Sequence, residues 1–179
     1  MKLVEYPDAE LMAMDVANRL AGELRQVLDH TERASFVVPG GTTPGPVFDA
    51  LCAVDLDWER VDVMLSDERW VPTVHVRSNT RLVRERLLTA RAEKARFIPL
   101  YAKAEQPEDV LAELEANIEP CLPISLLLLG MGEDMHTASL FPGAPGTDAA
   151  LTPDAPILVP VRPKGGREAR ISMSARVLR

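Results

Sequence analysis

The stretch Ala34-Ser-Phe-Val-Val-Pro-Gly-Gly-Thr-Thr-Pro-Gly45 joins a short apolar run to a dense cluster of turn-forming residues. The run Ala34–Val38 is partly β-branched and has the length of a strand, and the prolines and glycines after it end that strand in a loop. A helical apolar pattern resumes at residues 47–51. A strand, a glycine-rich loop and a helix in this order form the repeating unit of an α/β fold.

The same unit recurs further along the chain. Val61–Leu65 predicts a second strand, residues 66–78 a loop and residues 79–88 a helix. The run Ile124-Ser-Leu-Leu-Leu-Leu129 predicts a central strand buried on both faces, as in a parallel sheet. Further strands are expected at residues 96–99, 157–161 and 170–173, the last two at the edge of the sheet.

Two more helices are predicted from apolar residues at three-and-four spacing, at residues 8–28, with Asp8 as the N-cap, and at residues 107–118. Alternating strands and helices predict one α/β domain over residues 1–179, with a mostly parallel sheet flanked by helices. Ligands of such a fold bind at the carboxyl ends of the strands.

Composition narrows the class of protein. Hydrophobic residues make up 46% and charged residues 26%, which is enough apolar material for a folded core. The longest apolar runs are too short for a membrane helix, and carboxylates stand where a signal peptide would need its apolar segment. We therefore expect a soluble, cytoplasmic protein without a membrane partner.

Charge and cysteine content exclude two further classes of site. The 20 Lys and Arg against 27 Asp and Glu give a net charge of −7, which argues against a general nucleic-acid binder. Cys52 and Cys121 have no His or further Cys at metal-ligand spacing, so neither a zinc site nor a disulfide framework is indicated. Both cysteines are expected to be buried.

The first candidate site is the glycine loop after the first strand. Gly40 and Gly41 let the backbone approach a ligand, Thr42 adds a hydroxyl, and the following helix offers its positive N-terminal end. These features suit a phosphate, although the loop is neither the dinucleotide fingerprint nor a P-loop. A plain turn between strand and helix remains the alternative.

The second candidate site is Ser66-Asp-Glu-Arg-Trp-Val-Pro72, which leads to Ser78 and Asn79 at the start of a helix. Charged residues directly after a strand lie at the ligand-binding edge of the sheet, and Arg69 can hold a phosphate or carboxylate through two hydrogen bonds. The alternative is a solvated turn in which Asp67 and Arg69 pair with each other. Ser78 taken alone is better explained as a helix cap.

The third candidate site is Gly130-Met-Gly-Glu-Asp-Met-His-Thr-Ala-Ser-Leu-Phe-Pro-Gly143. Here His136 follows a carboxylate, Asp134, by two residues. A neutral imidazole can act as a general base, and a neighbouring carboxylate can stabilise the imidazolium. A purely structural loop histidine is the alternative. No Ser lies in a G-x-S-x-G turn, so a covalent acyl-enzyme is not indicated.

Taken together and in this order, these loops resemble the 6-phosphogluconolactonase family. Residues 39–44 resemble its glycine-glycine-Ser/Thr-Pro loop, and residues 128–143 follow its most specific signature almost throughout. The resemblance covers the chain from about Phe36 to its end. Its remaining matches are Asp57-Trp58, Ser66-Asp-Glu-Arg69, Ser78-Asn79 and Arg170-Ile-Ser-Met-Ser174.

The resemblance implies a Rossmann-like, three-layer fold of the sugar-phosphate isomerase and deaminase type. It also implies hydrolysis of 6-phospho-D-glucono-1,5-lactone to 6-phosphogluconate, in the oxidative pentose phosphate pathway, with no metal or organic cofactor. His136 would activate the water that attacks the lactone C1, and Asp134 would orient or stabilise His136. The implied substrate-binding residues are Gly40, Gly41, Thr42, Asp67, Arg69, Ser78, Asn79, Lys164 and Arg170.

The chain departs from the family pattern at two points. Met135 stands where the family has glycine, and a positive φ there would cost about 1 kcal/mol or more and could shift His136. Family members also continue beyond the strand at residues 170–173, so the domain is expected to be short at its C-terminus and to lack a layer of the fold. A second copy of the chain, in a homo-oligomer, could cover sheet left exposed in this way.

Two alternatives to the lactonase stay open. A glucosamine-6-phosphate deaminase would share the fold, but deaminases resemble Phe-Asn-Glu-Pro-Gly after the histidine, whereas residues 139–143 contain no acid. A non-catalytic relative that binds a sugar phosphate or a partner would instead be consistent with the two departures.

Overall fold

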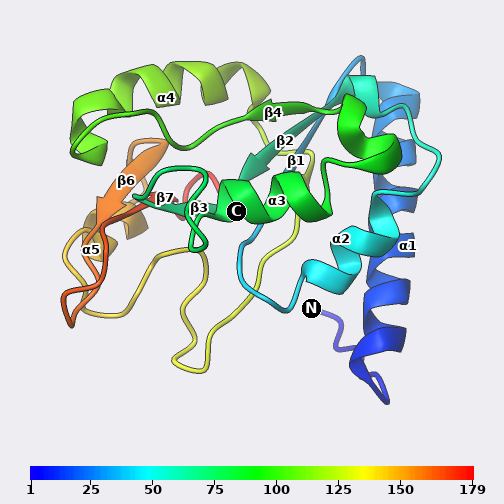
Figure 1. Ribbon diagram of the computed structural model, residues 1–179, viewed down its shortest axis with the longest axis horizontal. Coiled ribbons are helices and arrows are strands. Elements are labelled where there is room, and N and C mark those ends of the chain that lie inside the picture. The colour runs from blue at the N-terminus through cyan, green and yellow to red at the C-terminus, as the bar shows by residue number, and fades with distance from the viewer.

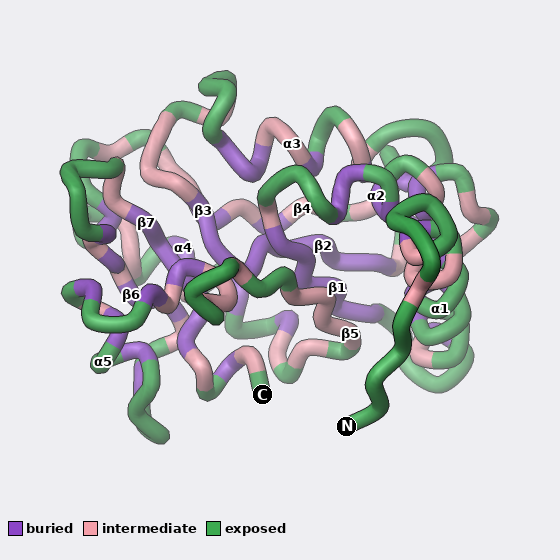
Figure 2. The backbone as a smooth tube through the Cα atoms, turned by 90° about the horizontal axis from the view of Figure 1, so that it is seen from below, coloured by how far each residue is buried: buried purple, intermediate pink, exposed green.

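The computed structural model describes residues 1–179, and its centre is a four-stranded parallel sheet with the strand order β4-β2-β1-β5 (Figure 1). Every residue of β1 and β2 is buried, and Figure 2 shows these two strands running through the middle of the molecule. The predicted α/β architecture is thereby confirmed. The strands of this sheet are β1 (Ala34–Val38), β2 (Val61–Leu65), β4 (Arg96–Ile98) and β5 (Leu126–Leu127).

The prediction of a central strand at residues 124–129 is wrong in its position. β5 lies at the edge of the sheet, pairs with β1 alone, and is only half-buried. Hydrogen bonds from Ser125 N to Ser35 O (3.1 Å) and from Leu128 N to Val37 O (2.9 Å) extend its contact with β1. An apolar run predicts that a strand is buried, but it does not show whether another strand follows on its far side.

A second, antiparallel sheet begins where β2 ends. It contains β3 (Asp67–Arg69), β7 (Arg170–Met173) and β6 (Leu158–Val161), in the order β3-β7-β6. The predicted loop at residues 66–78 therefore contains a strand, and the two late strands belong to this sheet rather than to the edge of the parallel one. The partner of β3 lies about a hundred residues further along the chain, where no local pattern could reveal it.

The helices lie around these sheets. They are α1 (Ala9–His30), α2 (Gly45–Leu51), α3 (Asn79–Arg86), α4 (Leu111–Ile118) and α5 (Thr147–Leu151). In Figures 1 and 2, α1 and α2 lie together at one side of the molecule, while α4, α5 and the antiparallel sheet lie at the other. None of the helices combines the length and apolar character needed to cross a lipid bilayer.

The helix starts follow the local sequence. Asp8 caps α1 by accepting a hydrogen bond from Leu11 N (2.8 Å), as predicted. Residues 107–118 do not form one α-helix, because a 3₁₀ turn at Pro107–Val110 precedes α4.

One continuous core joins α1, α2, α3, α4 and both sheets. Its largest fully buried side chains include Trp58, Phe36 and Phe48, and the indole N–H of Trp58 donates to Val54 O (3.0 Å). Cys52 and Cys121 are buried and unpaired, as predicted.

A charged cluster lies on β2. Asp62, whose side chain is 5% exposed, accepts hydrogen bonds from Arg33 Nη2 (2.6 Å) and Arg96 Nε (2.7 Å). Burial raises the pKa of Asp62, but the hydrogen bonds from the two arginines outweigh burial and hold this pKa below its usual value of 3.8. The cluster therefore supports folding through an ionised aspartate.

Candidate active site

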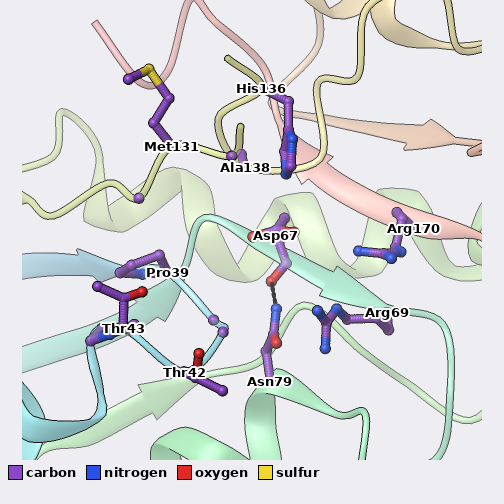
Figure 3. A pocket seen from close by; sticks show the side chains of 15 residues that line it. Pro39, Thr42, Thr43, Asp67, Arg69, Asn79, Met131, His136, Ala138 and Arg170 are labelled. Carbon is purple, nitrogen blue, oxygen red and sulfur yellow. Dashed lines mark hydrogen bonds between the residues drawn. The ribbon is translucent and has the colours of Figure 1, made fainter. Parts of the chain in front are cut away.

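The three predicted loops meet around one cavity of about 330 Å³ beside the carboxyl ends of β1, β2 and β5. Loops that follow neighbouring parallel strands lie side by side, so segments far apart in the sequence line the same space. Figure 3 shows side chains from all three loops, and from β7, pointing into it. The lining residues are Pro39, Gly40, Gly41, Thr42, Thr43, Pro44, Asp67, Arg69, Asn79, Gly130, Met131, Gly132, His136, Ala138 and Arg170.

The glycine loop forms one wall of the cavity. A Cβ atom at Gly40 would lie 2.0 Å from Oδ1 of Asn79, so only glycine allows this approach. Gly41 has a φ of +85°, a conformation that L side chains rarely adopt. The N–H groups of Gly40, Gly41 and Thr42 donate no hydrogen bond within the protein. They are therefore available to a ligand.

Asn79 links the glycine loop to β3. Its amide Nδ2 donates to Asp67 O (3.0 Å), an interaction drawn in Figure 3. Asn79 is also the first residue of α3, so the start of this helix sets the position of the amide.

Glu68, buried between β3 and α3, holds that helix start in place. Its carboxylate accepts hydrogen bonds from Asn79 N (2.8 Å), Thr80 N (2.8 Å), Thr80 Oγ1 (2.7 Å) and Ser78 Oγ (3.2 Å). A carboxylate at a helix N-terminus also interacts favourably with the helix dipole. Burial raises the pKa of Glu68 above its usual value, and these donors offset only part of that rise. Glu68 therefore anchors Asn79 without lining the cavity.

His136 and Asp134 form the predicted pair. The Nδ1 atom of His136 is hydrogen-bonded to Oδ1 of Asp134, and His136 N also donates to this oxygen (3.2 Å). The hydrogen bond from His136 lowers the pKa of Asp134. Because Nδ1 is engaged, Nε2 is the ring nitrogen left for a ligand, and the imidazole points into the cavity (Figure 3).

Two arginines lie opposite each other on the next wall. Arg69 and Arg170 are paired across β3 and β7, although like charges at such positions repel. The Nε atoms of both are buried without a hydrogen-bond partner. Burial and the charge of Arg69 lower the pKa of Arg170 to about 10. An anion in the cavity would relieve the repulsion between the two guanidinium groups.

Asp67 lies below His136 in Figure 3 and holds the loop that carries His136 in place. Its carboxylate accepts hydrogen bonds from Ser139 Oγ (2.6 Å) and Ser66 Oγ (3.1 Å). Ser139 is fully buried, and its N–H donates to Ser172 Oγ (3.3 Å) on β7. The His136 loop is thus tied to β3 and β7 of the antiparallel sheet.

The structure brings together most of the predicted site residues. Asp134 lies behind the imidazole, with its side chain 56% exposed. Ser78 is buried outside the cavity and caps α3, its hydroxyl accepting from Arg81 N (3.2 Å). Lys164 is exposed and does not line the cavity. The predicted residues that do line it are Gly40, Gly41, Thr42, Asp67, Arg69, Asn79, His136 and Arg170.

Other residues around the cavity were not predicted. Thr43 and Gly132 lie within the glycine loop and the His136 loop, so their place in these sequence motifs is the signal that points to them. Glu68, Ser139 and Phe141 act from behind the lining, and only their contacts show it.

Met135 adopts the positive φ expected for glycine at this position, 66°. Met135 is 75% exposed and does not line the cavity, and it borders a separate apolar groove with Leu129, Leu140 and Leu178. The predicted backbone strain is therefore present, but the side chain does not intrude on His136.

Comparison with known proteins identifies relatives of this chain. The chain is 47% identical over 149 residues to a 6-phosphogluconolactonase of Pseudomonas aeruginosa, which covers 83% of this chain and 63% of that protein. It is 39% identical over 176 residues to a 6-phosphogluconolactonase of Mesorhizobium japonicum, covering 97% and 74%. The chain thus spans less than two thirds of the length of the Pseudomonas relative.

Solved structures show the same fold. A 6-phosphogluconolactonase from Shewanella baltica superposes with a TM-score of 0.92 at 34% identity, covering 97% of this chain and 75% of that one. Residues 7–179 match the family described as glucosamine-6-phosphate isomerases/6-phosphogluconolactonase. The chain therefore belongs to the family of glucosamine-6-phosphate isomerases and 6-phosphogluconolactonases.

Proposed function

We propose that this protein hydrolyses 6-phospho-D-glucono-1,5-lactone to 6-phosphogluconate. The observation that carries the proposal is the placement of an Asp134-bound imidazole and two arginines around one cavity. A general base and a site for a dianion are the two elements that hydrolysis of a phosphorylated lactone requires. The names of the relatives support the same substrate.

In this reaction His136 acts as the general base. Its Nε2 accepts a proton from a water molecule as the water oxygen bonds to the lactone C1. The tetrahedral intermediate then collapses, the bond from C1 to the ring oxygen breaks, and the imidazolium returns its proton to that oxygen. Asp134 stabilises the imidazolium and keeps Nε2, rather than Nδ1, directed at the water.

Arg69 and Arg170 are assigned to the phosphate. They present two positively charged guanidinium groups from adjacent strands to the cavity, and a phosphate dianion can accept several hydrogen bonds from such groups. Lys164 is exposed and lies outside the lining, so the phosphate is assigned to the two arginines alone. Asp67 and Asn79 complete the floor below the sugar.

The glycine loop is assigned to the lactone end of the substrate. Negative charge develops on the carbonyl oxygen during attack, and backbone N–H donors placed in advance stabilise it. The free N–H groups of Gly40, Gly41 and Thr42 are such donors. The proposed steps use no metal or organic cofactor. We also propose that residues 1–179 act as a single domain. The proposed location is the cytoplasm, where sugar phosphates are metabolised.

The proposal is tested by measuring acid release from freshly prepared 6-phosphogluconolactone, with and without the protein. A rate well above spontaneous hydrolysis is expected, together with no ammonia release from glucosamine 6-phosphate. Ammonia release would instead identify a deaminase. Binding of 6-phosphogluconate without any rate enhancement would identify a non-catalytic relative.

A further inference from the structure

Phe141 does not line the cavity, but its ring lies against two residues that do, His136 and Arg170. Its ring centroid is 4.4 Å from that of His136, at an interplanar angle of 37°. The guanidinium carbon of Arg170 lies 5.5 Å from the same ring centroid, and that of Arg167 lies 5.2 Å from it. One aromatic ring therefore contacts the proposed general base and a proposed phosphate ligand.

The ring itself is held firmly. Phe141 is 8% exposed and packs with Ala144 and with Val161 of β6. Its carbonyl oxygen accepts hydrogen bonds from Thr147 Oγ1 (2.7 Å) and Ala144 N (3.1 Å). Because backbone and ring are both anchored, Phe141 provides a fixed surface for the more exposed groups around it.

Arg170 needs such a surface. Its guanidinium is almost fully buried, its Nε has no hydrogen-bond partner, and Glu168 lies 3.8 Å away, beyond hydrogen-bond distance. The face of an aromatic ring attracts a cation, and this attraction is stronger where water is excluded. The ring thus favours a charged guanidinium where few polar partners are available.

The imidazole of His136 has few polar partners. Its side chain contacts one hydrogen-bond partner, and that partner, Asp134, is itself more than half exposed. The Phe141 ring limits rotation of the imidazole away from the cavity. Figure 3 shows the imidazole and the Arg170 guanidinium facing the same space, so a shared support would set the spacing between them.

We propose that Phe141 is a positioning residue that fixes His136 relative to Arg170, and so aligns the reacting carbonyl with the base when the phosphate is bound. This inference rests on the proposed lactone hydrolysis. It deepens that proposal by naming a residue that touches no substrate yet couples the two ends of the site.

The test compares three variants. Phe141→Leu keeps an apolar side chain but removes the ring, Phe141→Tyr keeps the ring, and Phe97→Leu is the matched control. Phe97, on β4 and outside the cavity lining, also has a guanidinium over its ring, that of Arg84 at 5.5 Å. Melting temperatures, kcat, KM and the affinity for 6-phosphogluconate are measured for each.

Phe141→Leu is expected to lower kcat by about 10- to 100-fold, the scale of effect of misplacing a catalytic group by about 1 Å. It is also expected to weaken 6-phosphogluconate binding several-fold, while Phe141→Tyr keeps most of both. Phe97→Leu should change neither kcat nor the affinity for 6-phosphogluconate, even if it lowers the melting temperature as much as Phe141→Leu does. The inference is overturned if Phe141→Leu keeps kcat and product affinity, or if Phe97→Leu loses as much of both.

Failure of the proposed function gives a different result. In that case the wild-type protein itself does not exceed spontaneous hydrolysis. If it still binds 6-phosphogluconate, equal affinities of wild type and Phe141→Leu overturn the role of Phe141 at Arg170, and a several-fold loss supports that role. If it binds no product either, both proposals are wrong.

Discussion

A methyl group added at Gly132 would lie 2.3 Å from the imidazole Cε1 of His136. The two residues are also joined by a hydrogen bond from Gly132 N to His136 O (2.9 Å). The loop thus folds back so that the imidazole occupies the space that a side chain at position 132 would need. Gly132 does not have a positive φ, so the requirement for glycine comes from contact rather than from backbone conformation.

Gly132→Ala is therefore expected to displace His136 with little loss of stability. We expect kcat to fall by about 100-fold, since the base moves by roughly the width of a methyl group. The melting temperature should stay within about 3 °C of the wild type, because the change lies in a solvent-exposed loop. Steady-state kinetics and thermal unfolding check the two expectations, and an unchanged kcat would show that the imidazole can move without consequence.

Met135→Gly should instead change stability and leave kcat nearly unchanged. It removes a side chain from a left-handed backbone position at which a non-glycine residue costs about 1 kcal/mol. We expect the free energy of unfolding to rise by up to about 1 kcal/mol, less the added entropy of glycine in the unfolded chain. Because Met135 does not line the cavity, kcat should change less than twofold. Urea unfolding and a rate measurement suffice, and a large gain in kcat would mean that Met135 does disturb His136.

The Asp62 cluster predicts a pH dependence of stability. The pKa of Asp62 in the folded state lies below its ordinary value of 3.8, so the unfolded chain binds the proton more readily. The stability that this group contributes is present above that ordinary pKa and is lost as the pH falls through the lower, folded one. Wild-type stability should therefore decline below about pH 5.

Asp62→Asn isolates this contribution. The variant leaves Arg33 and Arg96 without their shared carboxylate, and we expect it to lose about 2 kcal/mol at neutral pH, between the values for exposed and buried ion pairs. The difference from the wild type should shrink as the pH falls toward 3. A constant difference across that range, in urea unfolding at each pH, would contradict the assignment.

Glu68→Gln tests the anchor of α3. The amide would place N–H donors against at least one of the donors at the start of the helix, so we expect a loss of about 2 kcal/mol in the free energy of unfolding. Asn79 should also shift, because its position depends on that helix start. Glu85→Gln, at the exposed C-terminal end of α3, is a suitable control and should cost less than about 0.5 kcal/mol. Equal losses in the two variants would contradict the anchoring role of Glu68.

Much of this architecture could be predicted from local sequence. The strands β1 and β2 and the N-cap Asp8 follow from apolar periodicity and capping chemistry, which depend on neighbouring residues alone. The loops that carry Gly40, Arg69 and His136 meet because parallel strands end at one edge of a sheet.

What escaped prediction depends on distant contacts. The pairing of β3 with β7, and hence the opposition of Arg69 and Arg170, joins segments about a hundred residues apart. The edge position of β5 depends on which strand neighbours it, and apolar content does not encode that. Nothing in the local sequence distinguishes Ser139 and Phe141 from ordinary loop residues. Their roles follow from the contacts of Ser139 with Asp67 and of Phe141 with His136.

The central claim is that His136 is the base for hydrolysis of the lactone. The most direct test compares the initial rate of acid release from 6-phosphogluconolactone for the wild type and for His136→Asn, with spontaneous hydrolysis subtracted. Asparagine can still hydrogen-bond but cannot take up the proton. We expect the wild-type rate to exceed the spontaneous rate clearly. In His136→Asn the rate above the spontaneous one should be at least about 100-fold lower, while the variant still binds 6-phosphogluconate. A variant as active as the wild type would contradict the account.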